Sequence, residues 1–173
     1  AHSHRFASED WDDVVRLVTE MRARHGVRWL VTNSRRTGDA GSDRFALLER
    51  EGVVERFVDW RRTGSGSIRD LFAADALIVT EDSVSMMSEA VAAQRPVIAL
   101  RPRDFEPTLV DDIVGTLVDG GAMAVTAIAG VDADALAATL LDLTPVATDH
   151  RDEIAAALRA RLPGLFPAGA EAR

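Results

Sequence analysis

Two short polar segments of the sequence combine arginine, hydroxyl and carboxylate groups in a way that suits an anionic ligand. Asn33-Ser34-Arg35-Arg36-Thr37 follows one apolar run, and Glu81-Asp82-Ser83 follows another. Arginine pairs or near-pairs follow two further apolar runs, as Arg61-Arg62 and Arg101-Pro102-Arg103. The planar guanidinium group matches phosphate oxygens and does not require lysine, which the chain lacks. These segments indicate an anion-binding site, with ordinary polar loops as the alternative interpretation.

The stretch SVSMMSEAVAAQ, residues 83–94, predicts a helix with two different faces. At helical spacing Ser85, Ser88 and Glu89 share one face. A carboxylate about two turns into such a helix can accept hydrogen bonds from vicinal hydroxyls, as acidic residues do with ribose. The apolar side chains share another face and would pack against a sheet. They are Val84, Met87 and Val91.

The amino end of this predicted helix is a second candidate for anion binding. Asp82 or Ser83 can cap the helix by accepting hydrogen bonds from its first N–H groups. The remaining N–H groups and the positive end of the helix dipole suit a phosphate. The alternative is that the serines only cap and solubilise the helix while Glu89 stays solvated.

Composition excludes several classes of function. Without cysteine there is no disulfide, thiolate nucleophile or cysteine zinc site, and without lysine there is no Walker or Schiff-base lysine. A formal net charge of −8 argues against nucleic-acid binding, although a local arginine cluster can still attract a small anion. The four histidines form no metal cluster beyond a weak His-Ser-His near the start. No window approaches the ~18 apolar residues of a membrane span, and no secretory leader is evident. The sequence predicts a cytoplasmic protein, with peripheral membrane association left open.

Apolar runs and amphipathic stretches alternate regularly, which predicts a Rossmann-like α/β fold. About five parallel strands with helices on both faces are expected in one domain over residues 1–163, followed by a disordered tail at 164–173. A TGSGS turn at 63–67 is the other low-complexity segment. Predicted strands cover residues 27–34, 54–60, 76–81, 96–102 and 122–128, and predicted helices cover 11–25, 43–51, 67–75, 83–94, 108–119, 132–143 and 149–161.

The predicted order of elements begins with a helix rather than a strand. A doubly wound sheet normally begins with a strand, which becomes the central strand of the sheet. We therefore expect the first strand to lie upstream, in a fragment of a two-domain protein.

The segments TNSRRTG and LFAADALIVTEDSVSMMSEA resemble the mitochondrial-fission (elongated mitochondria) family, which is described as glycosyltransferases of the GT-B type. The resemblance covers most of residues 1–102 and is specific at residues 34–37 and 79–90. The sequence departs from the family at Gly38, where the family has proline, and at SGSIRDLF, where it has an N-P-Y segment.

The second segment is also similar to the donor-binding segment of lipid-II-forming N-acetylglucosaminyltransferases. There a Ser-Glu pair is followed by a small apolar run and a proline seven residues after the glutamate, a spacing that Ser88-Glu89 and Pro96 reproduce. By that resemblance Glu89 would hold the ribose hydroxyls, and Ser83 or Ser85 would approach the diphosphate.

The resemblance implies the C-terminal, donor-binding half of a metal-independent glycosyltransferase. Its substrate would be a nucleotide-diphosphate sugar, with no other cofactor, and the acceptor pocket would lie on its own N-terminal domain. A non-catalytic adaptor of the mitochondrial-fission family and a nucleotide-sugar epimerase-like enzyme stay open as alternatives. No catalytic residue is predicted. The predicted nucleotide-sugar site comprises Ser34, Arg35, Arg36, Thr37, Asp82, Ser83, Ser85, Ser88 and Glu89.

Overall fold

The structure, a computed structural model, describes residues 6–63, 69–106, 111–145 and 150–161. The His-Ser-His sequence, most of the TGSGS turn and the predicted tail at 164–173 lie outside the described residues.

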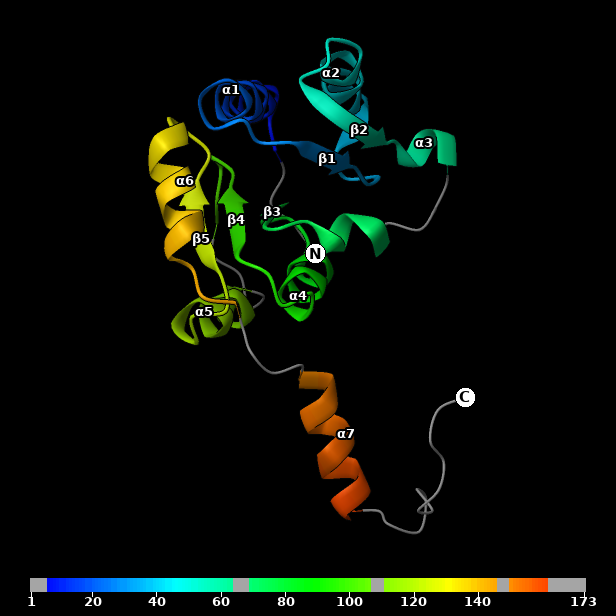
Figure 1. Ribbon diagram of the computed structural model, residues 1–173, viewed down its shortest axis with the longest axis vertical. Coiled ribbons are helices and arrows are strands. Elements are labelled where there is room, and N and C mark those ends of the chain that lie inside the picture. Colours follow the sequence, from blue (N-terminus) through cyan, green and yellow to red (C-terminus); the bar gives the residue numbers. More distant parts are fainter. Residues whose placement is uncertain (1–5, 64–68, 107–110, 146–149, 162–173) are drawn as a thin grey trace.

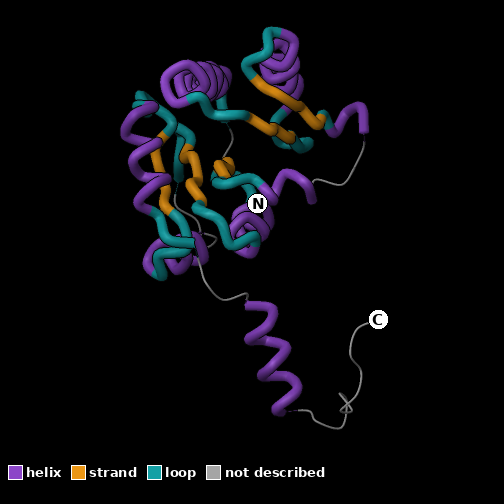
Figure 2. The backbone as a smooth tube through the Cα atoms, viewed as in Figure 1, coloured by secondary structure: helices purple, strands orange, loops and turns teal. Residues whose placement is uncertain are grey.

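The observed elements confirm the α/β class (Figures 1 and 2). The predicted helix over 67–75 is a short 3-10 helix, η1 (Arg69–Ala73), and a four-residue helix, α3 (Trp60–Thr63), was not predicted. The strands are β1 (Trp29–Thr32), β2 (Val54–Val58), β3 (Leu77–Thr80), β4 (Val97–Arg101) and β5 (Ala124–Ala127). The other helices are α1 (Ser8–His25), α2 (Gly38–Arg50), α4 (Val84–Ala92), α5 (Asp111–Asp119), α6 (Ala133–Asp142) and α7 (His150–Arg161).

All described strand pairs are parallel, as buried apolar strands separated by helices should be. The predicted five strands are present, but they divide into two sheets, β1-β2 and β3-β4-β5. Helices α1, α2 and α6 pack on one face, while α4 and α5 pack on the other. In Figure 1 α1 and α2 lie above β1 and β2, whereas α7 stands apart from the α/β body.

The alternation of side chains along β4 explains the two helical layers. Ile98 and Leu100 belong to the core that includes α1, α2 and α6. Val97 and Ala99 belong to the core that includes α4 and α5. Successive side chains of a strand point to opposite faces, so a strand covered on both sides must be apolar throughout. These four side chains are at most 2% exposed.

Helix α1 packs through apolar residues at three- and four-residue spacing, including Leu17 and Met21. Its end is set by Gly26, whose φ of 66° lies in the left-handed region that glycine adopts without strain. At the other end the Asp10 carboxylate accepts a hydrogen bond from the Ala7 N–H at 2.9 Å. Trp11 then meets Phe45 of α2 edge to face, with ring centroids 6.0 Å apart.

Candidate functional site

A cavity of about 710 Å³ lies between β1 and β3. Beyond the carboxyl ends of these strands its walls include Ser34 and Arg36 on one side and Asp82 and Ser83 on the other. Thr37 lines it as well. The two polar segments, more than 40 residues apart in the sequence, therefore meet at one cavity. Ligands of open α/β sheets bind at this edge.

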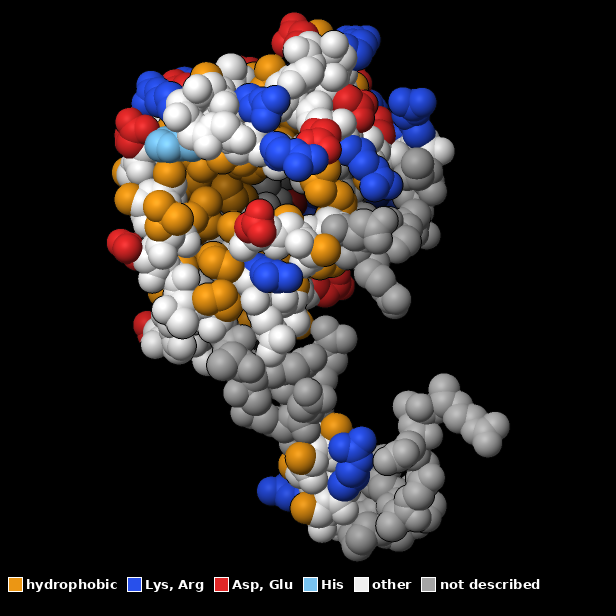
Figure 3. All heavy atoms as spheres, viewed as in Figure 1, with side chains coloured by type: hydrophobic (Ala, Val, Ile, Leu, Met, Phe, Trp, Pro, Cys, Tyr) orange, Lys and Arg blue, Asp and Glu red, His pale blue; other side chains and the backbone are white. Residues whose placement is uncertain are grey.

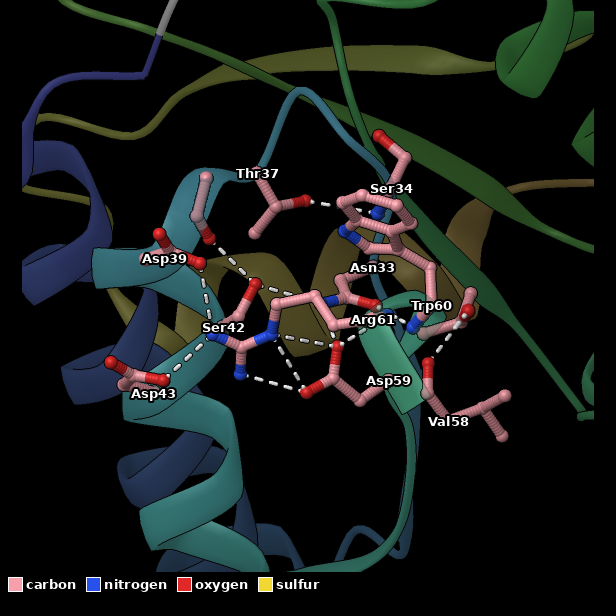
Figure 4. A network of polar contacts seen from close by, with 12 residues as sticks. Asn33, Ser34, Thr37, Asp39, Ser42, Asp43, Val58, Asp59, Trp60 and Arg61 are labelled. Carbon is pink, nitrogen blue, oxygen red and sulfur yellow. Dashed lines mark hydrogen bonds and ion pairs between the residues drawn. The ribbon is translucent and has the colours of Figure 1, made fainter. Parts of the chain in front are cut away.

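The segment from Ser34 to Thr37 forms a turn closed by its own hydrogen bonds. The Thr37 N–H donates to the Ser34 carbonyl at 3.1 Å, and the Ser34 N–H donates to Thr37 Oγ1 at 3.2 Å (Figure 4). The Arg36 N–H donates to Ser34 Oγ at 3.2 Å. The hydroxyl oxygens of Ser34 and Thr37 thus stabilise the turn. The side chains of Arg35 and Arg36 are exposed to solvent.

The residue after this turn has a backbone that proline cannot adopt. Gly38 has a φ of 68°, whereas the proline ring locks φ near −65°. Glycine adopts this left-handed backbone without strain, which suits the entry of the turn into α2.

The predicted cap of α4 is confirmed at Ser83. Its hydroxyl oxygen accepts a hydrogen bond from the Met86 N–H at 3.4 Å. Asp82 is held by the Thr80 hydroxyl, which donates to its carboxylate at 2.6 Å. Within the described part of the chain, no acceptor is found for the N–H groups of Val84 and Ser85. The first turn of α4 therefore has N–H groups that a ligand can use.

The predicted two faces of α4 are confirmed. Met87 and Val91 are 1% and 5% exposed, in the core, whereas Ser85, Ser88 and Glu89 are exposed to solvent. None of these three side chains lines the cavity.

The two arginines of the turn, Arg35 and Arg36, have different surroundings. The Arg35 guanidinium lies 5.7 Å from the centre of the Trp60 ring, a cation–π distance. Arg36 lines the cavity and makes no ion pair with any described residue. Arg36 is therefore the arginine of the predicted site that is best placed for an anion in the cavity.

Three of the four arginines in the other two predicted sets are bound to carboxylates of the protein, which corrects the expectation of three arginine sets around one anion. Arg61 contacts Asp59, Asp39 and Asp43 at 2.7 to 3.1 Å. Arg101 binds Glu81 through two hydrogen bonds of 2.7 Å. Arg103 binds Asp10 and Asp13 on α1. Apart from Arg61 with Asp59, which are neighbours in the sequence, these pairings join different elements, so the loop sequence alone did not reveal them.

Sequence reasoning missed a buried polar network beside the site (Figure 4). The Asn33 amide donates to Ser42 Oγ at 2.7 Å and to the Asp59 carboxylate at 3.0 Å. The Asn33 side-chain oxygen accepts a hydrogen bond from the Trp60 N–H at 2.8 Å. The network ties the ends of β1 and β2 to α2 and so holds the Ser34–Thr37 turn. Its signal in the sequence was a polar residue directly after each of two strands, Asn33 after β1 and Asp59 after β2.

We predict that the Asp59–Arg61 contact makes stability depend on pH. The pKa of Asp59 is lowered from its usual 3.8 to about 2, mainly by the hydrogen bonds from the Arg61 side chain. The hydrogen bond from the Asn33 amide also contributes to this lowering. Because the folded-state pKa is lowered, the stabilisation is present above pH 3.8 and is lost as the pH falls toward 2. Asp59→Asn should therefore cost on the order of 2 kcal/mol at pH 7, and the cost should shrink toward pH 2.

Denaturant titrations at pH 7, 4 and 2.5 measure this difference. Asp43→Asn is the matched control because that carboxylate contacts the same arginine but is 70% exposed. An Asp59→Asn cost that is equal at all three pH values would contradict the assignment.

Potential metal ligands are dispersed over the residues that the structure describes. These residues contain no group of three or more potential ligands. The chain has an Asp-x-Asp sequence at Asp132 and Asp134, but both side chains have structural partners. Asp132 caps α6 through the Ala135 N–H, and Asp134 binds His25 and Arg24.

Comparison with known proteins identifies one family. A family model described as Mitochondrial fission ELM1 matches residues 1–162. No curated protein and no solved structure matches the chain. Among the described helices, none is both long and apolar enough to cross a bilayer.

Proposed function

Since the chain belongs to the mitochondrial fission ELM1 family, we propose that it binds a nucleotide-diphosphate sugar as the donor-binding half of a glycosyltransferase. The observation that carries this proposal is the shared cavity. Arg36 and the hydroxyl-bearing turn reach it from β1, and the amino end of α4 reaches it from β3. The diphosphate would lie between them.

The charges at this edge suit a diphosphate. The N–H groups of the first turn of α4 point out of the helix toward its amino end, where the helix dipole adds a partial positive charge. Arg36 supplies a full positive charge without an internal carboxylate partner in the described structure. A local site of this kind can bind an anion although the whole chain carries a net charge of −8.

The exposed face of α4 would receive the nucleoside. A ligand whose diphosphate sits at the amino end of the helix can extend along its first two turns and meet Ser85, Ser88 and Glu89. Glu89 would then accept hydrogen bonds from the ribose hydroxyls, the role that the resemblance implies for it.

Binding at this position also fits the chemistry of glycosyl transfer. Negative charge grows on the leaving nucleotide in the transition state, and preorganised N–H groups and an arginine stabilise such charge. The acceptor and the catalytic base would lie on the other domain of the enzyme. We therefore expect the present chain to bind the donor without turning it over.

Calorimetric titration with UDP-, GDP- and ADP-sugars tests the proposal. We expect saturable binding of one of them, and Arg36→Ala should weaken it about tenfold or more, as for a lost hydrogen bond to a charged group. Glu89→Ala should lower the affinity for the same nucleotide sugar. It should have less effect on the affinity for inorganic diphosphate, which has no ribose. Arg50→Ala, which removes an exposed arginine from the last turn of α2, is the matched control.

If Arg36→Ala and Arg50→Ala lower the affinity for the nucleotide sugar equally, binding depends on the net charge of the protein and not on Arg36. Absence of binding by the full-length protein would favour the adaptor function over the transferase. Conversion of the bound sugar without an acceptor would favour the epimerase-like enzyme.

A further inference from the structure

The cavity between β1 and β3 is longer than a nucleotide site at one edge of a sheet requires. Its walls begin before both strands, at Gly26 and Ala74, and continue past their carboxyl ends to Ser34 and Asp82. A ligand at the carboxyl edge of the sheet would occupy one end of this channel. The remaining length runs beside the strands themselves.

The long walls of the channel are the edges of two strands. β1 pairs with β2, and β3 pairs with β4, and no described strand pairs with the other edge of either. Each such edge carries backbone N–H and C=O groups that point toward the channel. Backbone groups inside a protein almost always have partners, so these edges favour an occupant that itself has a backbone.

Apolar side chains cover the channel from both faces of the sheet. Val14, Leu17 and Met21 of α1 line it on one face. Leu71 and Phe72 of η1 contribute further apolar wall. Figure 3 shows a hollow with hydrophobic walls below α1 on the face in view. An occupant covered in this way must be apolar on both of its faces, as a central strand of a parallel sheet is.

The strands beside the channel are less buried than their sequences indicate. The residues of β3 are apolar up to Thr80 yet all are only half-buried, and Leu30 of β1 is 38% exposed. In β4, which has a neighbour on each side, Ile98 is fully buried. The difference follows from the missing neighbour.

We propose that the channel holds a sixth parallel strand, supplied by the same polypeptide on the N-terminal side of α1. The first turns of α1 lie at the carboxyl edge of the strands, because Asp10 binds Arg103 just after β4. Ser8 also accepts a hydrogen bond from Arg44, in the middle of α2. A strand that runs through the channel parallel to its neighbours ends at this same edge. It connects to α1 by a short loop, and α1 then returns to the start of β1.

This connection is a strand–helix–strand unit of the usual kind. It makes one continuous sheet of order β2, β1, new strand, β3, β4, β5, with the new strand at the centre, as in other doubly wound sheets. A strand of about five residues matches the length of its neighbours. This inference concerns the architecture and does not depend on nucleotide-sugar binding.

Thiol labelling tests the strand, because the 173 residues contain no cysteine and an introduced thiol is the single labelled group among them. Leu30→Cys places a thiol in the wall of the channel. The experiment compares the 173-residue chain with the longer polypeptide that the proposal requires, in which a strand-forming segment precedes Ala1. We expect the reagent to label Leu30→Cys at least about tenfold more slowly in the longer chain, because the strand covers the site.

Leu47→Cys is the matched control, since Leu47 is a 45% exposed leucine of α2 outside the channel, and its labelling should be equal in both chains. Hydrogen exchange of the unmodified chains provides a second measurement if Leu30→Cys does not fold. The amides of β1 and β3 should exchange more slowly in the longer chain, while those of α2 stay unchanged.

Three results would overturn the proposal. Equal labelling and exchange in the two chains would mean that the preceding residues do not enter the channel. Protection of β1 and β3 in the 173-residue chain equal to that of β4 would mean that the two edges close on each other. Protection that rises with protein concentration, together with a dimer in sedimentation velocity, would assign the strand to a second copy of the chain.

Discussion

Arg101→Ala is expected to lower the free energy of unfolding by about 3–5 kcal/mol, the cost of leaving a buried charge without its partner. Glu81 directly follows β3 and its side chain is fully buried. Its two carboxylate oxygens accept hydrogen bonds of 2.7 Å from the Arg101 guanidinium. The guanidinium also lies 3.9 Å from the centre of the Phe105 ring, so truncation removes that contact as well.

The chain contains a matched control for this prediction. Arg28 and Glu55 form the same two-bond geometry, also with distances of 2.7 Å. However, their side chains are 74% and 45% exposed, so water solvates whichever partner remains. Arg28→Ala should leave the midpoint of denaturant unfolding nearly unchanged.

Equilibrium unfolding in denaturant at pH 7 measures both variants. The double variant Glu81→Gln with Arg101→Met should be less destabilised than Arg101→Ala, because it leaves no buried charge. Equal midpoint shifts for Arg101→Ala and Arg28→Ala would show that burial of Glu81 does not determine the cost.

Ile98→Ala is expected to destabilise the protein by about 2–5 kcal/mol, through lost burial and the cavity it leaves. Ile98 is fully buried in the middle strand of the three-stranded sheet, and it packs in the core with α1 and α6. Ile98 packs against helices on one face of the sheet, and its strand is hydrogen-bonded to β3 and β5 on its two edges. These neighbours cannot move enough to fill the cavity that the substitution creates.

The comparison for this prediction is Leu30→Ala on β1. Leu30 is 38% exposed beside the channel, and its truncation should cost less than about 1 kcal/mol in the 173-residue chain. Both variants are measured by denaturant unfolding, with the slope checked against the unmodified chain. A cost of Leu30→Ala as large as that of Ile98→Ala would mean that β1 is as well covered as β4.

Local features of the fold could be predicted from the sequence because local interactions produce them. The three- and four-residue spacing of α1, the left-handed Gly26 and the Ser83 cap each depend on residues within about one helical turn. The two faces of α4 follow in the same way. The strict alternation of strands and helices then indicated the parallel α/β class.

Part of the candidate site could also be predicted, because the carboxyl ends of parallel strands share one edge. The turn after β1 and the start of α4 after β3 do reach one cavity. The sequence did not indicate which predicted residues line it. Ser85, Ser88 and Glu89 turn to solvent instead, since the apolar side chains of α4 determine how the helix rotates on the sheet.

The sequence by itself determined the five strands, the longer helices between them, their order and the polar character of the segments that follow β1 and β3, although it did not indicate α3. Only the tertiary structure decided which charges meet, as between Arg103 and Asp10, which are 93 residues apart. It also decided that the strands divide around a channel rather than form one sheet. The physical reason is that spacing and caps act within a turn of the chain. Ion pairs, strand neighbours and cavities, in contrast, depend on how distant elements pack together.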